Sequence, residues 1–359
     1  GYIDTVKSNC DLYYGFYTNI ASAANKSTYT FTHIQFEKNI TSPYIKQRVP
    51  YTSVITPEWF GAIGDGETDD TGAVIDALKY SNTITFGEHS AYKVNNAELH
   101  DYNCIDLGGA TIYTDSSAFI NSAEDDALQR VTIMNGNIIG TGTASNLINI
   151  ACFYSTFFNL RLSNAKIGIN IVGRTVTTGS LVENTFVRIR VDNCSDTGIN
   201  LSRGVGITDS MFYNCFINGM TESNYGINIG NAAGTLINQC HFYGTPKTHL
   251  RVNSSSHTIV NNCYFEGNAI SYSLWCNTIR TISIGNNIFV CSTNGLTCIR
   301  ADCLDGSTSD GIRAVVLNGN TFESYTADIK GKTIESFSTE HPVITNNNST
   351  IADVYGTFS

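Results

Sequence analysis

Charged residues are scarce in this chain of 359 residues, where Asp, Glu, Lys and Arg make up 14% of the sequence and the net charge is −10. A nucleic-acid partner requires clustered Lys and Arg to contact phosphates, so the composition argues against one. The sequence also lacks a run of about 18 apolar residues, the minimum for a membrane-spanning helix. We therefore expect neither a nucleic acid nor a membrane as a partner.

Proline is rare, with 5 residues, and the strong helix formers Leu, Ala, Lys and Glu are also scarce. Asn and Thr are abundant instead, together with 31 Gly. Residues that favour strands and turns therefore dominate. This composition predicts an all-β protein.

No Cys-x-x-Cys pair occurs among the 11 cysteines, so the sequence gives no indication of a zinc site or of a cofactor. The odd number and the length of the chain also argue against a disulfide framework. Five cysteines recur every 21 to 28 residues: Cys194, Cys215, Cys240, Cys263 and Cys291. This spacing predicts an internal stack of small buried thiols, one in each structural repeat.

A phenylalanine recurs at similar intervals of 23 to 33 residues, at Phe186, Phe212, Phe242, Phe265, Phe289 and Phe322. A repeat of this size fits one coil of a parallel β-helix, in which three short strands are joined by turns. Because side chains alternate along a strand, each Phe and the residue two places before it are expected to point inward. The predicted inner column is Asn184, Ser210, Cys240, Cys263, Asn287 and Asn320.

A glycine-rich segment followed by an apolar helix precedes the repeats. It reads Gly-Ala-Ile-Gly-Asp-Gly-Glu-Thr-Asp-Asp-Thr from Gly61 to Thr71 and continues to Leu78. Thr68 or Asp69 is expected to cap the helix, whose apolar face would close the end of the solenoid. The acids of the segment are interpreted as turn formers and caps.

This segment and the repeats resemble the pectate-lyase superfamily of single-stranded right-handed β-helices, which includes phage tailspikes and capsule depolymerases. The resemblance extends over residues 57 to about 355 and implies a right-handed parallel β-helix with a short N-terminal capping helix. We expect the β-helix to span residues 56–359. Residues 1–55, rich in Tyr, Thr and Asn, are expected to form a small β cap or attachment region, with a strand at 29–36.

The alternation of side chains also predicts which residues are exposed beside each Phe. Tyr213, Tyr243, Val290 and Glu323 are expected to point outward, and one patch spanning three coils is predicted to contain Tyr213, His241, Tyr243, Tyr264 and Glu266. Aromatic faces interspersed with carboxylates suit sugar rings. Glu266 and Glu323, two coils apart, are candidate catalytic acids, and Glu183 and Asp209 form a second candidate pair.

The reaction type stays open at this point. Hydrolysis by paired carboxylates is favoured, and the alternative is β-elimination, in which Lys247 and Arg251 neutralise an acidic sugar and His241 or Tyr243 removes a proton. The sequence lacks the Asn-Thr-Asp, Gly-His-Gly and Arg-x-Lys motifs of the polygalacturonase branch, and it has no Gly-x-Ser-x-Gly elbow.

The resemblance implies a virion component assembled in the host cytoplasm. This tailspike-like depolymerase would form a homotrimer and act on a capsular, O-antigen or exopolysaccharide. Two other functions are compatible with the same residues. One is a tail fibre that binds polysaccharide without cleaving it, and the other is a free-standing bacterial polysaccharide enzyme.

Overall fold

The computed structural model describes residues 2–3, 14–15, 54–121, 127–142, 144–171, 181–201, 207–219, 223–230, 232–253, 256–267, 269–279, 281–291, 296–303, 314–324, 332–337 and 341–349. The chain divides into two units, Gly1–Arg48 and Val49–Ser359. In the first unit, β1 (Tyr2–Ile3) and β2 (Tyr14–Gly15) pair antiparallel. The strand expected at 29–36 lies outside the described residues, and the attachment role of residues 1–55 stays a prediction.

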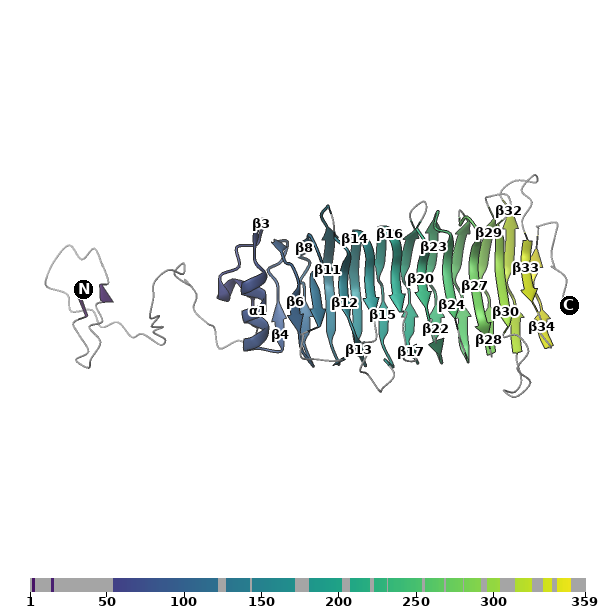
Figure 1. Ribbon diagram of the computed structural model, residues 1–359, viewed down its shortest axis with the longest axis horizontal. Helices are drawn as coiled ribbons and strands as arrows, with labels where there is room; N and C mark the ends of the chain where they lie inside the picture. Colours follow the sequence, from purple (N-terminus) through teal and green to yellow (C-terminus); the bar gives the residue numbers. More distant parts are fainter. Residues whose placement is uncertain are drawn as a thin grey trace. The chain divides into compact units, whose positions relative to one another are not determined.

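The second unit is a parallel β-helix whose coils each contribute a strand to three faces, and Figure 1 shows these strands stacked side by side. Face 1 comprises β4 (Thr83–Thr85), β7 (Cys104–Asp106), the first parts of β11 (Thr132–Gly140) and β14 (Thr156–Ile171), β15 (Thr185–Val187), β18 (Met211–Tyr213), β22 (Leu236–Asn238), β25 (Thr258–Asn261), β28 (Thr281–Gly285), β31 (Ala314–Asn318) and β34 (His341–Thr345).

Face 2 follows after a short turn. It comprises β5 (Ala91–Lys93), β8 (Thr111–Thr114), the later parts of β11 and β14, the first part of β16 (Arg190–Leu201), β19 (Phe216–Gly219), β23 (His241–Gly244), β26 (Tyr264–Gly267), β29 (Ile288–Cys291), β32 (Thr321–Ser324) and β35 (Asn348–Ser349).

Face 3 completes each coil. It comprises β6 (Ala97–Leu99), β9 (Phe119–Asn121), β12 (Asn146–Ile150), the ends of β14 and β16, β20 (Tyr225–Ile229), β24 (Thr248–Asn253), β27 (Tyr272–Ile279), β30 (Thr297–Cys303) and β33 (Lys332–Phe337). Two short parallel pairs lie outside the faces: β10 (Leu128–Gln129) with β13 (Cys152–Phe153), and β17 (Ile207–Thr208) with β21 (Ala232–Ala233). The predicted right-handed parallel β-helix is confirmed.

The N-terminal end of the β-helix is closed by η1 (Pro57–Phe60), β3 (Asp65–Asp69) and the helix α1 (Thr71–Tyr80). Val74 and Leu78 of α1 are buried against the first coil. Asp70, and not Thr68 or Asp69, is the N-cap residue of the helix. The carboxylate of Asp70 makes no capping bond, because it accepts hydrogen bonds from the amides of Ile63 (2.7 Å) and Gly64 (3.3 Å) in the glycine-rich loop.

All six phenylalanines of the repeat are buried, as predicted, but they form two stacks on different faces. On face 1, Phe186 stacks on Phe157 and Phe212 with ring centroids 5.0 and 4.6 Å apart. Phe212 then pairs with Ile237 in the next coil. The second stack begins on face 2 and contains Phe242, Phe265, Phe289 and Phe322. The 30-residue interval from Phe212 to Phe242 therefore joins two columns.

The predicted inner column is likewise buried but divided between the two turns that flank face 1. Asn184 and Ser210 precede face 1, whereas Cys240, Cys263, Asn287 and Asn320 lie in the turn between faces 1 and 2. In this second turn Asn287 Nδ2 donates to Asn320 Oδ1 and to Val260 O, each at 3.0 Å. These bonds satisfy buried amides from one coil to the next.

The predicted cysteine stack contains three of the five expected residues. Cys215, Cys240 and Cys263 occupy the turn between faces 1 and 2, and burial, with the two neighbouring thiols, raises the pKa of Cys240 well above its ordinary value. Cys194 and Cys291 are buried at the ends of face-2 segments. The nine cysteines whose side chains the structure describes are free thiols.

Among the histidines that the structure describes, only His249 is completely buried. Its burial makes the stability of the fold depend on pH. Burial lowers its pKa from 6.5 to about 4, and its Nδ1 has no hydrogen-bond partner among the described residues. Below pH 6.5 the unfolded chain protonates this ring while the folded chain does not, so the free energy of unfolding decreases as the pH falls toward 4. A pKa shift of this size corresponds to about 3 kcal/mol in the free energy of unfolding.

We expect His249→Gln to remove this contribution. The measurement is the difference in thermal stability between wild type and variant at pH 7 and at pH 4.5, since carboxylates contribute equally to both proteins. Equal pH dependence in the two proteins would contradict the assignment.

No helix among the described residues is long and apolar enough to cross a membrane.

Candidate functional site

The outward side of face 2 gathers aromatic and ionisable side chains from three consecutive coils. The strand register places Phe216 of β19, His241 of β23 and Tyr264 of β26 in one column, and Tyr243 and Glu266 in the next. We call these five residues the His241 cluster. Their side chains are partly exposed, which agrees with the alternation that buries Phe242 and Phe265 between them.

The His241 cluster is held together by ring contacts and one hydrogen bond. The His241 ring packs edge-on against Phe216 with centroids 4.6 Å apart, and it lies 4.8 Å from Tyr264 and 5.6 Å from Tyr243. His241 Nε2 is 3.1 Å from Glu266 Oε2, and the side chains are 29% and 42% exposed. An imidazole and a carboxylate in contact beside open aromatic faces can exchange protons with a bound substrate.

A group of charged residues lies beside the His241 cluster, in the coils that precede it along the chain. Asp192 accepts hydrogen bonds from Arg190 Nε (2.8 Å) and Arg161 Nε (3.3 Å). Burial opposes ionisation of Asp192, but the hydrogen bond and charge of Arg190 prevail and lower its pKa. The Arg190 guanidinium in turn lies 4.6 Å from the Phe216 ring centroid.

The pKa of Tyr243 depends on its burial and on the charged residues beside it. Burial, and then the charge of Asp192, raises the pKa of its phenol, so Tyr243 is protonated at neutral pH. It can therefore donate a hydrogen bond to a ligand.

Glu323 lies two coils beyond Glu266 on the same face, since both residues pair with Val290 in the coil between them. Their backbones are thus separated by about 10 Å, two strand spacings. Glu323 is exposed, but Val290, which was expected to point into solvent, is only 2% exposed. An apolar step therefore separates the two glutamates.

Two sequence-predicted binding residues lie elsewhere. Tyr213 is exposed on face 1, paired with Val187 and Asn238, because its phenylalanine neighbour belongs to the first stack. Arg251 is on face 3, in β24, one turn after the strand that carries His241. The prediction that Tyr213 shares the patch is therefore wrong, and so is the prediction that Arg251 lies at one site with His241 or Tyr243. Substrate binding by Tyr213 and Arg251 stays a prediction.

Glu183 and Asp209 occupy equivalent positions in adjacent coils, two residues before the paired Thr185 and Met211. Both have left-handed backbones, with φ of 55° and 58°, and both are exposed at the turn before face 1. They lie on a different column from the His241 cluster. This position suits turn formation, and their catalytic role stays a prediction.

Four residues at or beside the His241 cluster were not predicted from the sequence: Arg161, Arg190, Asp192 and Phe216. The turn between faces 1 and 2 contained the signal, because Cys215, Cys240 and Cys263 align in it and the residue after each begins face 2. Aligning on this turn places Arg190, Phe216, His241 and Tyr264 in one column. Among the described residues, no group of three or more His, Cys, Asp or Glu side chains is arranged to hold a metal ion.

Comparison with known proteins gives one sequence relative and several structural ones. The chain is 26% identical over 221 residues to a capsule K30/K69-specific depolymerase of Klebsiella phage K64-1, a match that covers 58% of this chain and 23% of the depolymerase. The chain thus spans about a quarter of that protein. No protein-family model matches the chain.

Among solved structures, the A-module of the mannuronan C-5 epimerase AlgE4 from Azotobacter vinelandii matches with a TM-score of 0.57 at 14% identity, covering 84% of this chain and 98% of the module. PfbA, a surface adhesin of Streptococcus pneumoniae, matches with a TM-score of 0.51 at 12% identity, covering 84% and 93%. These likenesses concern the fold alone. They agree with the parallel β-helix that the strand register of this chain forms.

Proposed function

We propose that this chain is the polysaccharide-degrading β-helix of a phage tailspike, and that the His241 cluster is where it binds and cleaves a bacterial capsular polysaccharide. The observation that carries the proposal is the contact between His241 and Glu266 in the middle of partly exposed aromatic rings. Aromatic faces pack on the C–H faces of sugars, and the ionisable pair supplies proton transfer at the same place.

Hydrolysis is the reaction that we favour. One carboxylic acid donates a proton to the glycosidic oxygen, and a carboxylate across the bond removes a proton from the attacking water. Glu266 and Glu323 are the proposed pair, since a backbone separation of about 10 Å is compatible with the wider spacing of inverting enzymes. His241 is the positioning residue for Glu266, and Tyr243 and Tyr264 bind the sugar.

Polysaccharide lysis by β-elimination is the second candidate, and the arginines beside Tyr243 favour it. In this reaction a base removes the proton from the carbon next to a uronate carboxylate, and a carbon–carbon double bond forms. The bond to the leaving sugar oxygen breaks, and that oxygen takes a proton from Tyr243 or from water. His241 is the proposed base, and Arg190 would neutralise the uronate. Arg190 is already paired with Asp192, which is the reason to place this reaction second.

The experiment that tests the proposal is incubation of the purified chain with a panel of capsular polysaccharides. We expect new reducing ends from the capsule that it recognises. Reducing ends without the ultraviolet absorbance of unsaturated uronates would support hydrolysis. Equal yields of reducing ends and of unsaturated uronates would support β-elimination. Binding to a capsule with no products would contradict the enzyme and favour a non-catalytic tail fibre.

The assembly that we propose is a homotrimer in the phage tail, assembled in the host cytoplasm. Analytical ultracentrifugation tests the trimer, and a monomer that cleaves capsule at full rate would favour a free-standing enzyme. The O-antigens and exopolysaccharides of the host are the other substrate classes for the same panel.

A further inference from the structure

Face 3 carries a line of outward side chains that the proposed function does not use. Each is the middle residue of an apolar–polar–apolar or similar triplet, such as Ile-Asn-Ile at 148–150 and 227–229 or Leu-Arg-Val at 250–252. The strand register places one such residue from each of seven consecutive coils in a single column: Asn149, Asn170, Asn200, Asn228, Arg251, Trp275 and Arg300.

The N-terminal half of the column is a ladder of amides. Asn170 Nδ2 donates to Asn149 Oδ1 at 2.8 Å, and the same bond recurs from Asn200 to Asn170 (2.8 Å) and from Asn228 to Asn200 (2.9 Å). Asn170 and Asn228 are buried, 8% and 7% exposed, whereas Asn200 between them is partly exposed and keeps a second N–H for a ligand. The ladder fixes the direction of these donors.

Arg251 continues the ladder and is held between two aromatic rings. Its Nη1 donates to Asn228 Oδ1 at 3.3 Å, and its guanidinium carbon lies 5.4 Å from the Tyr225 centroid and 5.0 Å from the Trp275 centroid. Arg251 forms no ion pair with any residue that the structure describes. Its Nε is buried without a hydrogen-bond partner among them, so a ligand would meet the Nη groups. A guanidinium held rigidly with unused donors is arranged to bind a carboxylate in bidentate fashion.

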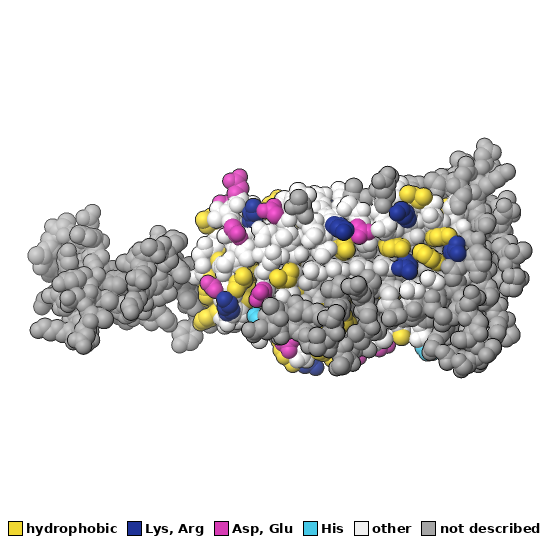
Figure 2. Space-filling model, viewed as in Figure 1, with side chains coloured by type: hydrophobic (Ala, Val, Ile, Leu, Met, Phe, Trp, Pro, Cys, Tyr) yellow, Lys and Arg dark blue, Asp and Glu magenta, His cyan; other side chains and the backbone are white. Residues whose placement is uncertain are grey.

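The next coils repeat this combination. The Arg300 guanidinium lies 5.2 Å from the Tyr272 centroid, and the Tyr272 ring lies 5.6 Å from that of Trp275. In Figure 2, hydrophobic and Lys or Arg side chains lie next to one another over the region that β20, β24, β27 and β30 occupy in Figure 1. Arg300 pairs in the strand register with Glu335 of the next coil, whereas the register neighbours of Arg251 are the uncharged Asn228 and Trp275.

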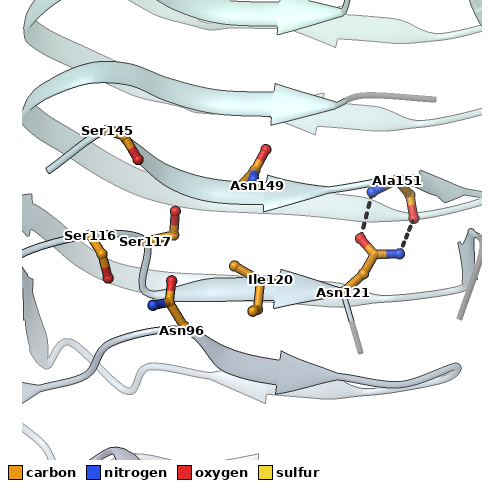
Figure 3. A pocket seen from close by; sticks show the side chains of 8 residues that line it. All are labelled: Asn96, Ser116, Ser117, Ile120, Asn121, Ser145, Asn149 and Ala151. Carbon is orange, nitrogen blue, oxygen red and sulfur yellow. Dashed lines mark hydrogen bonds between the residues drawn. The ribbon is translucent and has the colours of Figure 1, made fainter. Parts of the chain in front are cut away.

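A polar pocket of about 370 Å³ lies at the other end of the ladder. Figure 3 shows Asn149 and Ser145 of one coil above Ser116 and Ile120 of the coil below, all lining this pocket. Hydroxyl and amide groups at such an opening suit the hydroxyl groups of a sugar.

We propose that face 3 is a second polysaccharide-binding surface, which binds an extended acidic polysaccharide with its carboxylates on Arg251 and its sugar rings on Trp275 and Tyr272. Coils repeat about every 4.8 Å, close to the length of one hexopyranose unit, so each coil contacts about one sugar. Charge complementarity selects a uronate-containing chain over a neutral one. The inference rests on the proposed function only in taking a polysaccharide as the ligand.

The test compares binding of one acidic capsular polysaccharide with binding of the same polymer after chemical reduction of its carboxyl groups. Wild-type protein is expected to bind the native polymer at least about tenfold more tightly, the loss expected for one charge-assisted hydrogen bond. Arg251→Gln and Trp275→Ala are expected to lose about the same factor on the native polymer. On the reduced polymer, Arg251→Gln should bind like wild type.

The matched control is Arg130→Gln, because Arg130 also lies over a tyrosine ring, Tyr102 at 5.7 Å, but away from face 3. This control should bind both polymers like wild type. Equal binding of native and reduced polymer by wild type, no binding of any acidic capsule in a panel, or an unaffected Arg251→Gln would each overturn the proposal. So would a change of oligomeric state in Arg251→Gln or Trp275→Ala, since face 3 would then be a subunit interface.

Variants of the His241 cluster separate this proposal from the proposed function. Glu266→Gln should retain the preference for the native polymer whether or not it still cleaves. If Glu266→Gln cleaves normally while Arg251→Gln loses affinity, the catalytic proposal fails and the face-3 surface stands.

Discussion

Replacing Glu266 by Gln is expected to lower the rate of capsule cleavage by about 100- to 10,000-fold, the usual contribution of a positioned acid or base. The amide retains the size of the side chain and its contact with His241, which lies 3.1 Å away, but it cannot exchange a proton at neutral pH. The measurement is the initial rate of reducing-end formation, with the affinity for the uncleaved polymer determined in parallel. We expect the affinity to change little.

Two further substitutions show which reaction the acid serves. Under hydrolysis by paired carboxylates, Glu323→Gln should be impaired to a similar degree, whereas under β-elimination it should cleave nearly as fast as wild type. Glu88→Gln serves as the matched control, since Glu88 is an exposed glutamate between β4 and β5 and has no predicted catalytic role. A Glu266→Gln protein that cleaves within a few-fold of wild type would refute the site.

His241 gives an additional readout. As a positioning residue for Glu266, it should affect the pH dependence of cleavage more than the affinity for the polymer. His241→Gln is therefore expected to shift the pH profile, and an unchanged profile with reduced stability would indicate a structural role alone.

Phe265→Ala is expected to destabilise the β-helix by about 3–5 kcal/mol, the usual cost of truncating a buried phenylalanine. Phe265 is completely buried, and its ring lies 4.8 Å from that of Phe242 and 4.6 Å from that of Phe289. Removing it interrupts the stack and leaves a cavity between two coils. The observable is a lower melting temperature, with faster hydrogen exchange in β23, β26 and β29.

Ile288→Ala is the matched control, because Ile288 begins β29 on the same face but is 43% exposed. Truncating this side chain should lower the free energy of unfolding by well under 1.5 kcal/mol, since little buried apolar surface is lost. Because each coil of a solenoid contacts mainly its neighbours, exchange at the N-terminal coils near α1 should be unaffected by Phe265→Ala. Comparable destabilisation by the two variants would contradict the assignment of the core.

The sequence by itself determined the fold and the direction of most side chains. Recurring Phe, Cys and Asn residues specify coils of about two dozen residues, and the period of two in a strand then sorts inner from outer positions. Phe242 and Phe265 are buried, and Tyr243 and Glu266 are partly exposed beside them, as that alternation predicts. Local periodicity suffices for this because each coil repeats the same backbone.

Only the tertiary structure decided which residues share a face. A phenylalanine fills the core equally well before or after the turn between faces 1 and 2, so the interval from Phe212 to Phe242 concealed a move from one face to the next. That move removes Tyr213 from the site and brings Phe216 into it. The same uncertainty of register placed Arg251 beside His241, whereas its strand lies on face 3. Intervals along the chain give the length of a coil, but the pairing between coils, which depends on loop lengths, fixes which side chains meet.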